Sequence, residues 1–117
     1  MTAEEFRRLA LGLPGACEGA HLGHADFRVG GRIFATLGWP EEGFAMVKLA
    51  PEEQEMYRSI DPAAFVPVKG AWGRRGATQV RLPLAASASV HGALSAAWRR
   101  AAPRPASRGA GAREGKV

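Results

Sequence analysis

Two turn signals divide the first half of the chain into short runs and are the strongest constraint on its fold. Gly30-Gly31 is typical of a two-residue β-hairpin turn, and Pro-Glu-Glu-Gly at residues 40–43 is a second turn. The runs beside them, residues 26–29, 32–39 and 44–49, have the short, apolar character of strands. Three strands joined by short links pair as neighbours in antiparallel order. The sequence therefore predicts an antiparallel meander.

Side chains alternate along the middle run, as expected of a strand with two different faces. We expect one face to carry Ile33, Ala35, Leu37 and Trp39, and the other to carry Phe34 and Thr36.

Three helices are predicted around this meander. Residues 2–13 begin with a capping box, in which Thr2 caps the helix and Glu5 follows three positions later. A second helix opens at Pro51 and ends at Asp61-Pro62, with Met56 and Ile60 expected to face inward. A third helix starts with Ser87 or Ser89 as its cap and runs to about residue 101. Its apolar stripe contains Val90, Leu94, Ala97, Trp98 and Ala101.

The remaining segments complete the expected fold. Residues 16–24 read as a loop, residues 65–69 as an extended edge interrupted by proline, and residues 70–76 as a glycine-rich connection. Residues 78–82 alternate and form a fourth strand. The resulting order, α-β-β-β-α-β-α, predicts an α+β domain with an antiparallel sheet and helices packed on one face.

The 117 residues suit one domain, which we place at residues 1–102. Residues 103–117 are rich in proline, arginine, serine, glycine and alanine, so we expect a disordered tail. Much of the net charge of +5 belongs to this tail, whose charged residues are Arg104, Arg108, Arg113, Glu114 and Lys116.

The composition also suggests a location. Cys17 is the single cysteine, so no disulfide can form within the chain. No apolar run approaches the roughly 20 residues of a membrane span, and the first residues are acidic where a secretory signal would be basic. We expect a cytoplasmic protein without membrane association.

A polar cluster at residues 17–26 contains side chains of metal-binding type. Its members are Cys17, Glu18, His21, His24 and Asp26. Their spacing matches no established metal pattern, and proximity along a chain does not make Cys17 and a histidine a catalytic pair. We therefore expect a solvated loop with a small buried thiol at Cys17, and no metal, no cofactor and no catalytic residue. A thiol or metal enzyme using these residues remains the least favoured alternative.

The segment from Lys69 to Arg81 has the character of a binding site. It contains a Gly-x-x-Gly-x-x-Gly run at residues 70–76 and no acidic residue. The run lacks the lysine and the hydroxyl residue that a phosphate-binding loop needs before its helix. Trp72 offers a stacking face, and arginines fork onto phosphates. The structural alternative is a hairpin loop whose Trp72 packs on the core.

Four stretches together resemble the MmcQ/YjbR family. They are HADFRVGGRIFATL at residues 24–37, VKLAPEEQ at 47–54, FVPVKGAWGRRGAT at 65–78 and AWRRAAP at 97–103. Ala77 departs from the family, which often has tryptophan there, so only Trp72 remains in the loop. The resemblance implies a fold like that of CyaY, the bacterial frataxin, with two hairpin wings and DNA binding.

We therefore expect a non-enzymatic DNA-binding protein. Trp72 is expected to support the loop or stack on a base, and Arg28 and Arg32 flank the Gly30-Gly31 tip as a second wing. The expected phosphate contacts are Arg28, Arg32, Lys69, Arg74, Arg75 and Arg81. The alternative is a protein-interaction or small anionic-ligand module that uses the same basic loop.

Overall fold

The computed structural model describes residues 1–103 and contains one six-stranded antiparallel sheet in the order β1-β2-β3-β4-β6-β5. The strands are β1 (Cys17–His21), β2 (His24–Val29), β3 (Arg32–Leu37), β4 (Phe44–Lys48), β5 (Phe65–Pro67) and β6 (Ala77–Arg81). The helices are α1 (Ala3–Leu11), α2 (Pro51–Ile60), α3 (Ala71–Arg74) and α4 (Ser87–Ala101), with a 3₁₀ turn η1 (Leu82–Leu84). The predicted α+β class and antiparallel sheet are confirmed, with two more strands than expected. The expected tail lies outside the described residues from position 104 onward.

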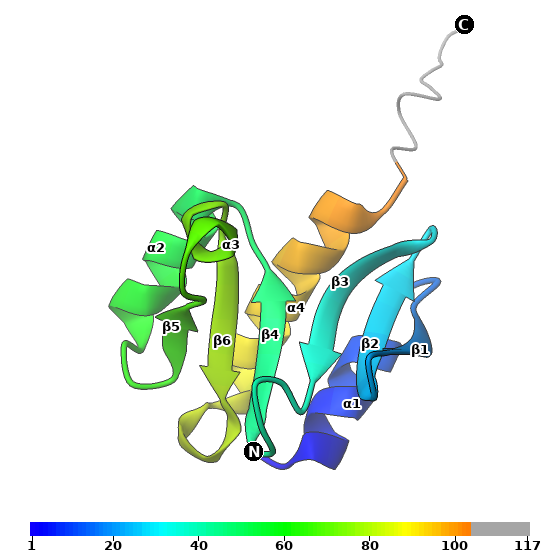
Figure 1. Ribbon diagram of the computed structural model, residues 1–117, viewed down its shortest axis with the longest axis horizontal. Coiled ribbons are helices and arrows are strands. Elements are labelled where there is room, and N and C mark those ends of the chain that lie inside the picture. Colours follow the sequence, from blue (N-terminus) through cyan, green and yellow to red (C-terminus); the bar gives the residue numbers. More distant parts are fainter. Residues whose placement is uncertain (104–117) are drawn as a thin grey trace, which may run out of the picture.

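The longer helices cover one face of the sheet and leave the other open. Figure 1 shows α4 crossing behind β3 and β4, with α1 and α2 on either side of it. The buried stripe of α4 includes Val90, Leu94 and Ala97, as predicted, whereas Trp98 is half-buried. Among residues 1–103 no helix has both the length and the apolar character required to cross a bilayer.

The capping box of α1 is formed as predicted. Thr2 Oγ1 accepts the Glu5 N–H at 3.1 Å, and the Glu5 carboxylate accepts the Thr2 N–H at 2.7 Å. The backbone hydrogen bond from Thr2 lowers the pKa of Glu5. The helix buries Phe6, whose ring packs edge-on against Phe27 with 6.0 Å between ring centroids. It ends at Leu11, two residues before the expected end, with Gly12 as its C-cap.

The expected serine cap of α4 is wrong. Ala86 occupies the N-cap position, and no side chain caps the first turn. Position 86 has the extended backbone that a cap residue requires, so Ser87 already lies within the helix.

The expected loop at residues 16–24 is wrong, because residues 17–21 form β1 and pair with β2. Most side chains of β1 are exposed, so the segment has no buried face to reveal a strand pattern. Its order comes from backbone pairing and from the turn at Leu22-Gly23, where both residues have positive φ angles, +52° and +82°. At Gly19, a Cβ atom would lie 2.9 Å from Asp26 Oδ1, so the position requires glycine.

The expected alternation along β3 is broken by one extra residue. Phe27 pairs with Ala35 but the next residue, Arg28, pairs with Ile33, which leaves Phe34 without a partner on β2. A β-bulge of this kind shifts the side-chain pattern. Phe34 therefore enters the core with Ala35, in contrast to the predicted facing, and Ile33 turns to the open face.

The expected inward face of α2 is also wrong. Met56 and Ile60 are 49% and 58% exposed, whereas Tyr57 is buried and packs against Phe65 with 5.3 Å between ring centroids. Burial raises the pKa of the Tyr57 phenol. Gly92 of α4 lies beside Tyr57, where an added Cβ would meet the phenol oxygen at 2.6 Å. The helix α2 thus packs on the domain through Tyr57, and not through Met56 and Ile60.

The glycine-rich connection folds into the single turn α3, and two of its glycines are internal packing positions. A Cβ at Gly73 would lie 1.6 Å from the Val68 carbonyl oxygen, and one at Gly76 would lie 1.9 Å from that of Leu49. Gly76 also has φ +113°, a conformation that L side chains rarely adopt. These glycines allow the segment to approach the protein's own backbone.

We predict that Gly76→Ala lowers the free energy of unfolding by about 3 kcal/mol, because a clash with backbone adds to an unfavourable φ. Gly23→Ala is the matched control, since Gly23 has φ +82° but no atom within 4 Å of an added Cβ. It should cost only about 1 kcal/mol. Urea denaturation of both variants measures the difference, and equal losses would contradict the packing role of Gly76.

Candidate functional site

The open face of the sheet carries a cross-strand row of polar and apolar side chains. The register places Asp26 opposite Thr36, Thr36 opposite Met46, and Met46 opposite Gln79. Directly paired residues project to the same side of a sheet, so these four share one face. The buried residues Phe27, Ala35, Val47 and Val80 occupy the opposite side, toward the helices.

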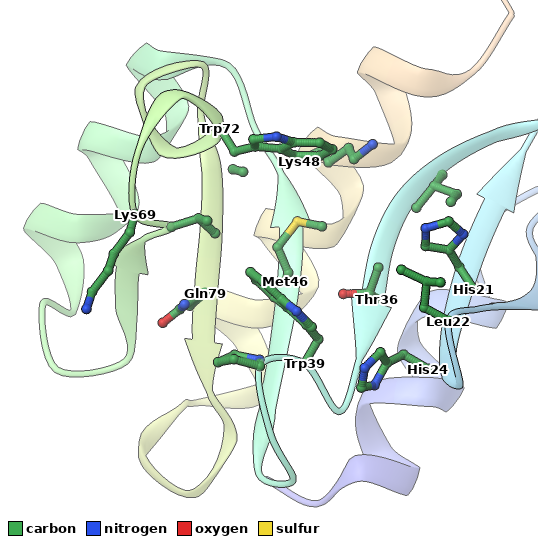
Figure 2. Close-up of a pocket in the computed structure, with 14 residues that line it drawn as sticks. His21, Leu22, His24, Thr36, Trp39, Met46, Lys48, Lys69, Trp72 and Gln79 are labelled. Atoms are coloured by element: carbon green, nitrogen blue, oxygen red, sulfur yellow. The ribbon is translucent and has the colours of Figure 1, made fainter.

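A hollow of about 660 Å³, here called the face groove, lies over this row. Figure 2 shows its labelled side chains, with Trp72 at one end, Trp39 and His24 toward the other, and Met46 between the two tryptophans. The lining is mainly apolar and aromatic; its polar members are His21, His24, Thr36, Lys48, Lys69 and Gln79. Of the described residues, no aspartate or glutamate lines it.

Trp72 projects from α3 and is 59% exposed, so it does not pack on the core. The Lys48 Nζ atom lies 5.3 Å from the centroid of its ring, within the range of a cation–π contact. The tryptophan therefore keeps a large part of its aromatic surface available for a ligand.

Gln54 of α2 holds the segment that carries Trp72 in place through hydrogen bonds. Its Nε2 atom donates to the carbonyl oxygens of Gly73 and Ala77, each at 3.0 Å, and lies 3.2 Å from Thr78 Oγ1. Thr78 Oγ1 in turn donates to the Gly76 carbonyl at 2.8 Å. These bonds hold α3 on the body of the domain, and its exposed side chains, Trp72 and Arg74, point outward.

A second hollow, here called the basic cleft, has a volume of about 490 Å³ and opens where β3 leaves β4. The two strands pair only between Ala35–Leu37 and Ala45–Val47, and Figure 1 shows β3 bending away beyond that point. The last turn of α4 fills the gap from behind. The cationic lining residues are Arg28, Arg32, Lys48 and Arg100, and no described aspartate or glutamate lines the cleft.

The structure brings three of the predicted phosphate contacts to one end of the sheet. The β2–β3 hairpin carries Arg32 there, and the β5–β6 connection carries Arg74 and Arg75. Lys69 belongs to the same connection, but Figure 2 shows its side chain directed away from Trp72. All four side chains are exposed, and none forms an ion pair with another residue in the range 1–103. Arg81 is not part of this end, because it pairs with Phe44 at the opposite end of β4 and β6.

Arg28 differs from the other predicted contacts because it is held by a buried carboxylate. Its Nε atom donates to Asp26 Oδ1 at 2.8 Å and its second terminal nitrogen to Oδ2 at 3.0 Å. These bonds lower the pKa of Asp26, although burial alone would raise it, and the side chain of Asp26 is fully buried. The Arg28 guanidinium is thus bonded within the sheet and has fewer free N–H donors for a phosphate.

The polar cluster at residues 17–26 does not converge on a metal. Cys17 is exposed on the edge strand, so the expected burial of its thiol is wrong, because β1 has no buried face. The Asp26 carboxylate is bonded to Arg28. Within residues 1–103, no three side chains of metal-binding type lie close enough to hold an ion.

Sequence reasoning missed several residues of this site, among them Leu22, Trp39, Lys48 and Arg100. Lys48 and Arg100 lie outside the basic segment, and only the fold brings them to the cleft. Trp39 was expected on the same face of a strand as Ile33, Ala35 and Leu37, but the strand ends earlier, at Leu37. A tryptophan directly before the turn at residues 40–43 and the Leu-Gly pair between two histidines were the available signals.

We predict that Arg28→Ala destabilises the domain by about 3 kcal/mol, because it leaves the Asp26 carboxylate buried without its partner. Asp26→Asn should cost less, about 1 kcal/mol, since the Arg28 side chain is 37% exposed and can turn to water. Chemical denaturation of both variants compares the two losses. A larger loss for Asp26→Asn would contradict this account.

The same pair predicts a dependence on pH. Because folding lowers the pKa of Asp26, its stabilisation is complete above the ordinary value of about 3.9 and is lost as the pH falls through the lower folded value. Asp26→Asn should therefore lose less stability than the unmodified protein when denaturation is measured on descending from pH 5 into this acid range.

Comparison with known proteins agrees with this fold. The chain is similar to the crystal structure of Deinococcus radiodurans protein DR2400, a DUF419 domain, with a TM-score of 0.68 and 19% identity over 83% of this chain and 75% of that one. At that identity the likeness shows the fold alone, and the expected likeness to CyaY stays a prediction. No curated protein matches the sequence. The family model YjbR matches residues 11–100, and the chain therefore belongs to the YjbR family.

Proposed function

We propose that this protein binds DNA without catalysing a reaction, and that the phosphates meet the end of the sheet where the basic cleft opens. One observation carries the proposal: the cleft is lined by four cationic side chains, of which only Arg28 is paired with a carboxylate, and no carboxylate of the described residues lines it. A hollow lined by charges of one sign concentrates the electric field and attracts ions of the opposite sign. A polyanion is the partner that such a surface fits best.

The two flanks of the cleft extend this surface. Arg32 stands on the hairpin side, and Arg74 and Arg75 stand on the α3 side, with Lys48 between the flanks. Guanidinium groups fork onto phosphate oxygens, and such contacts position a nucleic acid without reading its sequence. Such phosphate contacts require a positive charge in the right position, but no catalytic acid, base or nucleophile. The proposal therefore includes no catalytic step. It places the protein in the cytoplasm, where DNA is available.

A small anionic ligand is the second candidate, and the face groove favours it. Its volume of about 660 Å³ falls in the range of small-molecule sites, which are mostly apolar with a few placed polar groups. Such a ligand would saturate the protein at one equivalent and would not be displaced by competing DNA.

We predict that Arg74→Ala combined with Arg75→Ala weakens DNA binding and makes it less dependent on salt. Each lost phosphate contact should lower the slope of log affinity against log salt concentration by about 0.7–0.9. Fluorescence anisotropy of a labelled DNA oligonucleotide, titrated at several salt concentrations with the full-length protein, measures both quantities.

The matched control is Arg8→Ala combined with Arg81→Ala, which removes the same charge from exposed residues outside the basic end. Its affinity should fall by much less. A second variant replaces the tail cations Arg104, Arg108, Arg113 and Lys116 by glutamine in the full chain. Equal weakening by the two double variants, or loss of all binding in the tail variant, would sink the proposal that the cleft is the binding surface.

A further inference from the structure

We infer, as a step that rests on the proposed DNA binding, that the bound nucleic acid is single-stranded and that its bases lie in the face groove. The proposal concerns the strand form and the surface that contacts the bases. The basic cleft attracts phosphates of either form, whereas the face groove distinguishes between them.

The groove presents two aromatic faces to solvent. Trp72 is 59% exposed and Trp39 is 37% exposed, and Figure 2 shows them toward opposite ends of the groove with Met46 between them. Exposed aromatic side chains beside a positively charged groove are stacking platforms for unpaired bases. A duplex offers no such base faces along its length, because its bases stay paired and stacked on one another. The arrangement therefore favours a single strand.

The charges of the groove suit the backbone of such a strand. Lys69 and Lys48 lie at its rim, and Lys48 and Ile33 line both the groove and the basic cleft, so the two hollows adjoin. From Phe44 to Lys48, β4 provides a floor of roughly 13 Å at the usual rise per strand residue. This length accommodates a short stretch of bases while their phosphates reach the cleft.

The groove floor also contains unused polar groups. Thr36 Oγ1 is buried and has no hydrogen-bond partner among residues 1–103. The Gln79 amide lies on the same face, one strand beyond Met46. A buried hydroxyl without a partner is costly, and a base edge offers both donors and acceptors. The Gln79 amide is placed to bond with such an edge, whereas the Thr36 hydroxyl is shielded and can do so only when a neighbouring side chain moves aside.

Leu22 gives a separate indication that the groove binds a ligand. It lines the groove, is 84% exposed, and has φ +52°, where a leucine is unfavourable. The first position of a two-residue turn with positive φ angles normally carries asparagine or glycine. A leucine at this position costs stability and gains no burial within the domain, so we expect its side chain to contact a ligand.

The test measures anisotropy of labelled single-stranded oligothymidylate and of a duplex of equal length against the full-length protein and its variants. Single-strand affinity should exceed duplex affinity. Trp72→Ala and Trp39→Ala should each weaken single-strand binding about tenfold, since one stacked base contributes on the order of 1–3 kcal/mol and 1.4 kcal/mol is a factor of ten. Duplex binding should change little. Trp39→Phe and Trp72→Phe, which retain a stacking face, should recover most of the loss.

Trp98→Phe is the matched aromatic control. Trp98 lies on α4, on the helical side, and its indole N–H donates to the Pro14 carbonyl at 2.8 Å. Its replacement should leave DNA affinity unchanged, and circular dichroism of every variant verifies that the fold is retained.

The possible failures separate the two proposals. Equal or tighter duplex binding, or unchanged single-strand binding in the Trp39→Ala/Trp72→Ala protein, overturns the single-strand inference; the DNA proposal survives if Arg74→Ala/Arg75→Ala still weakens binding. Absence of binding to either form at low salt overturns both. Saturation by thymidine monophosphate with no gain from a longer strand assigns the groove to a small anionic ligand and also overturns the inference.

We predict that Leu22→Asn raises the melting temperature, because asparagine accepts the positive φ, and weakens single-strand binding several-fold, because the apolar contact is lost. Thermal unfolding and anisotropy are measured on the same preparation. A rise in stability with unchanged affinity would show that Leu22 has no part in binding.

Discussion

One extra residue in β3 shapes the end of the molecule where the proposed binding surface lies. The bulge beside Phe27 and Arg28 turns Phe34 into the core and Ile33 outward, so the side-chain alternation along the strand changes at this point. Bulges also increase local twist, and β3 separates from β4 directly beyond its paired residues. The basic cleft is the space left by that separation. Ile33, which the bulge turns outward, lines both the cleft and the face groove.

The basic segment combines structural and exposed positions in the period of one helical turn. Gly70, Gly73 and Gly76 recur every three residues, and the last two press against the backbones of Val68 and Leu49. Trp72, Arg74 and Arg75 occupy positions between the glycines and are exposed. Gly73 lies within α3, whereas Gly70 and Gly76 flank it with positive φ angles. The close backbone contacts of Gly73 and Gly76 leave the side chains between the glycines facing solvent, while Gln54 keeps the turn in place from α2.

Local patterns predicted the parts of the fold in which side-chain burial follows the element's period. The capping box at Thr2, the hairpin at Gly30-Gly31 and the buried stripe of Val90, Leu94 and Ala97 are of this kind. β1 was missed because its pairing depends on backbone hydrogen bonds and on a glycine beside Asp26, neither of which leaves an apolar alternation. The cleft was missed for a different reason. Arg32, Lys48 and Arg100 are far apart in the chain, and only the register and the path of α4 bring them together.

The contact between Lys48 and Trp72 couples the two chemical features of the surface. In the free protein, the Lys48 ammonium is 5.3 Å from the centroid of the Trp72 ring, where the electron density of the indole attracts it. A base that stacks on that face must displace the ammonium, and the flexible lysine stem allows the charge to move to a nearby phosphate. When a base stacks on Trp72, the protein loses the cation–π contact and gains a Lys48–phosphate contact. The lost contact offsets part of the free energy gained by stacking. A ligand with a base but no phosphate would lose the lysine contact without replacing it, which favours ligands that carry both groups.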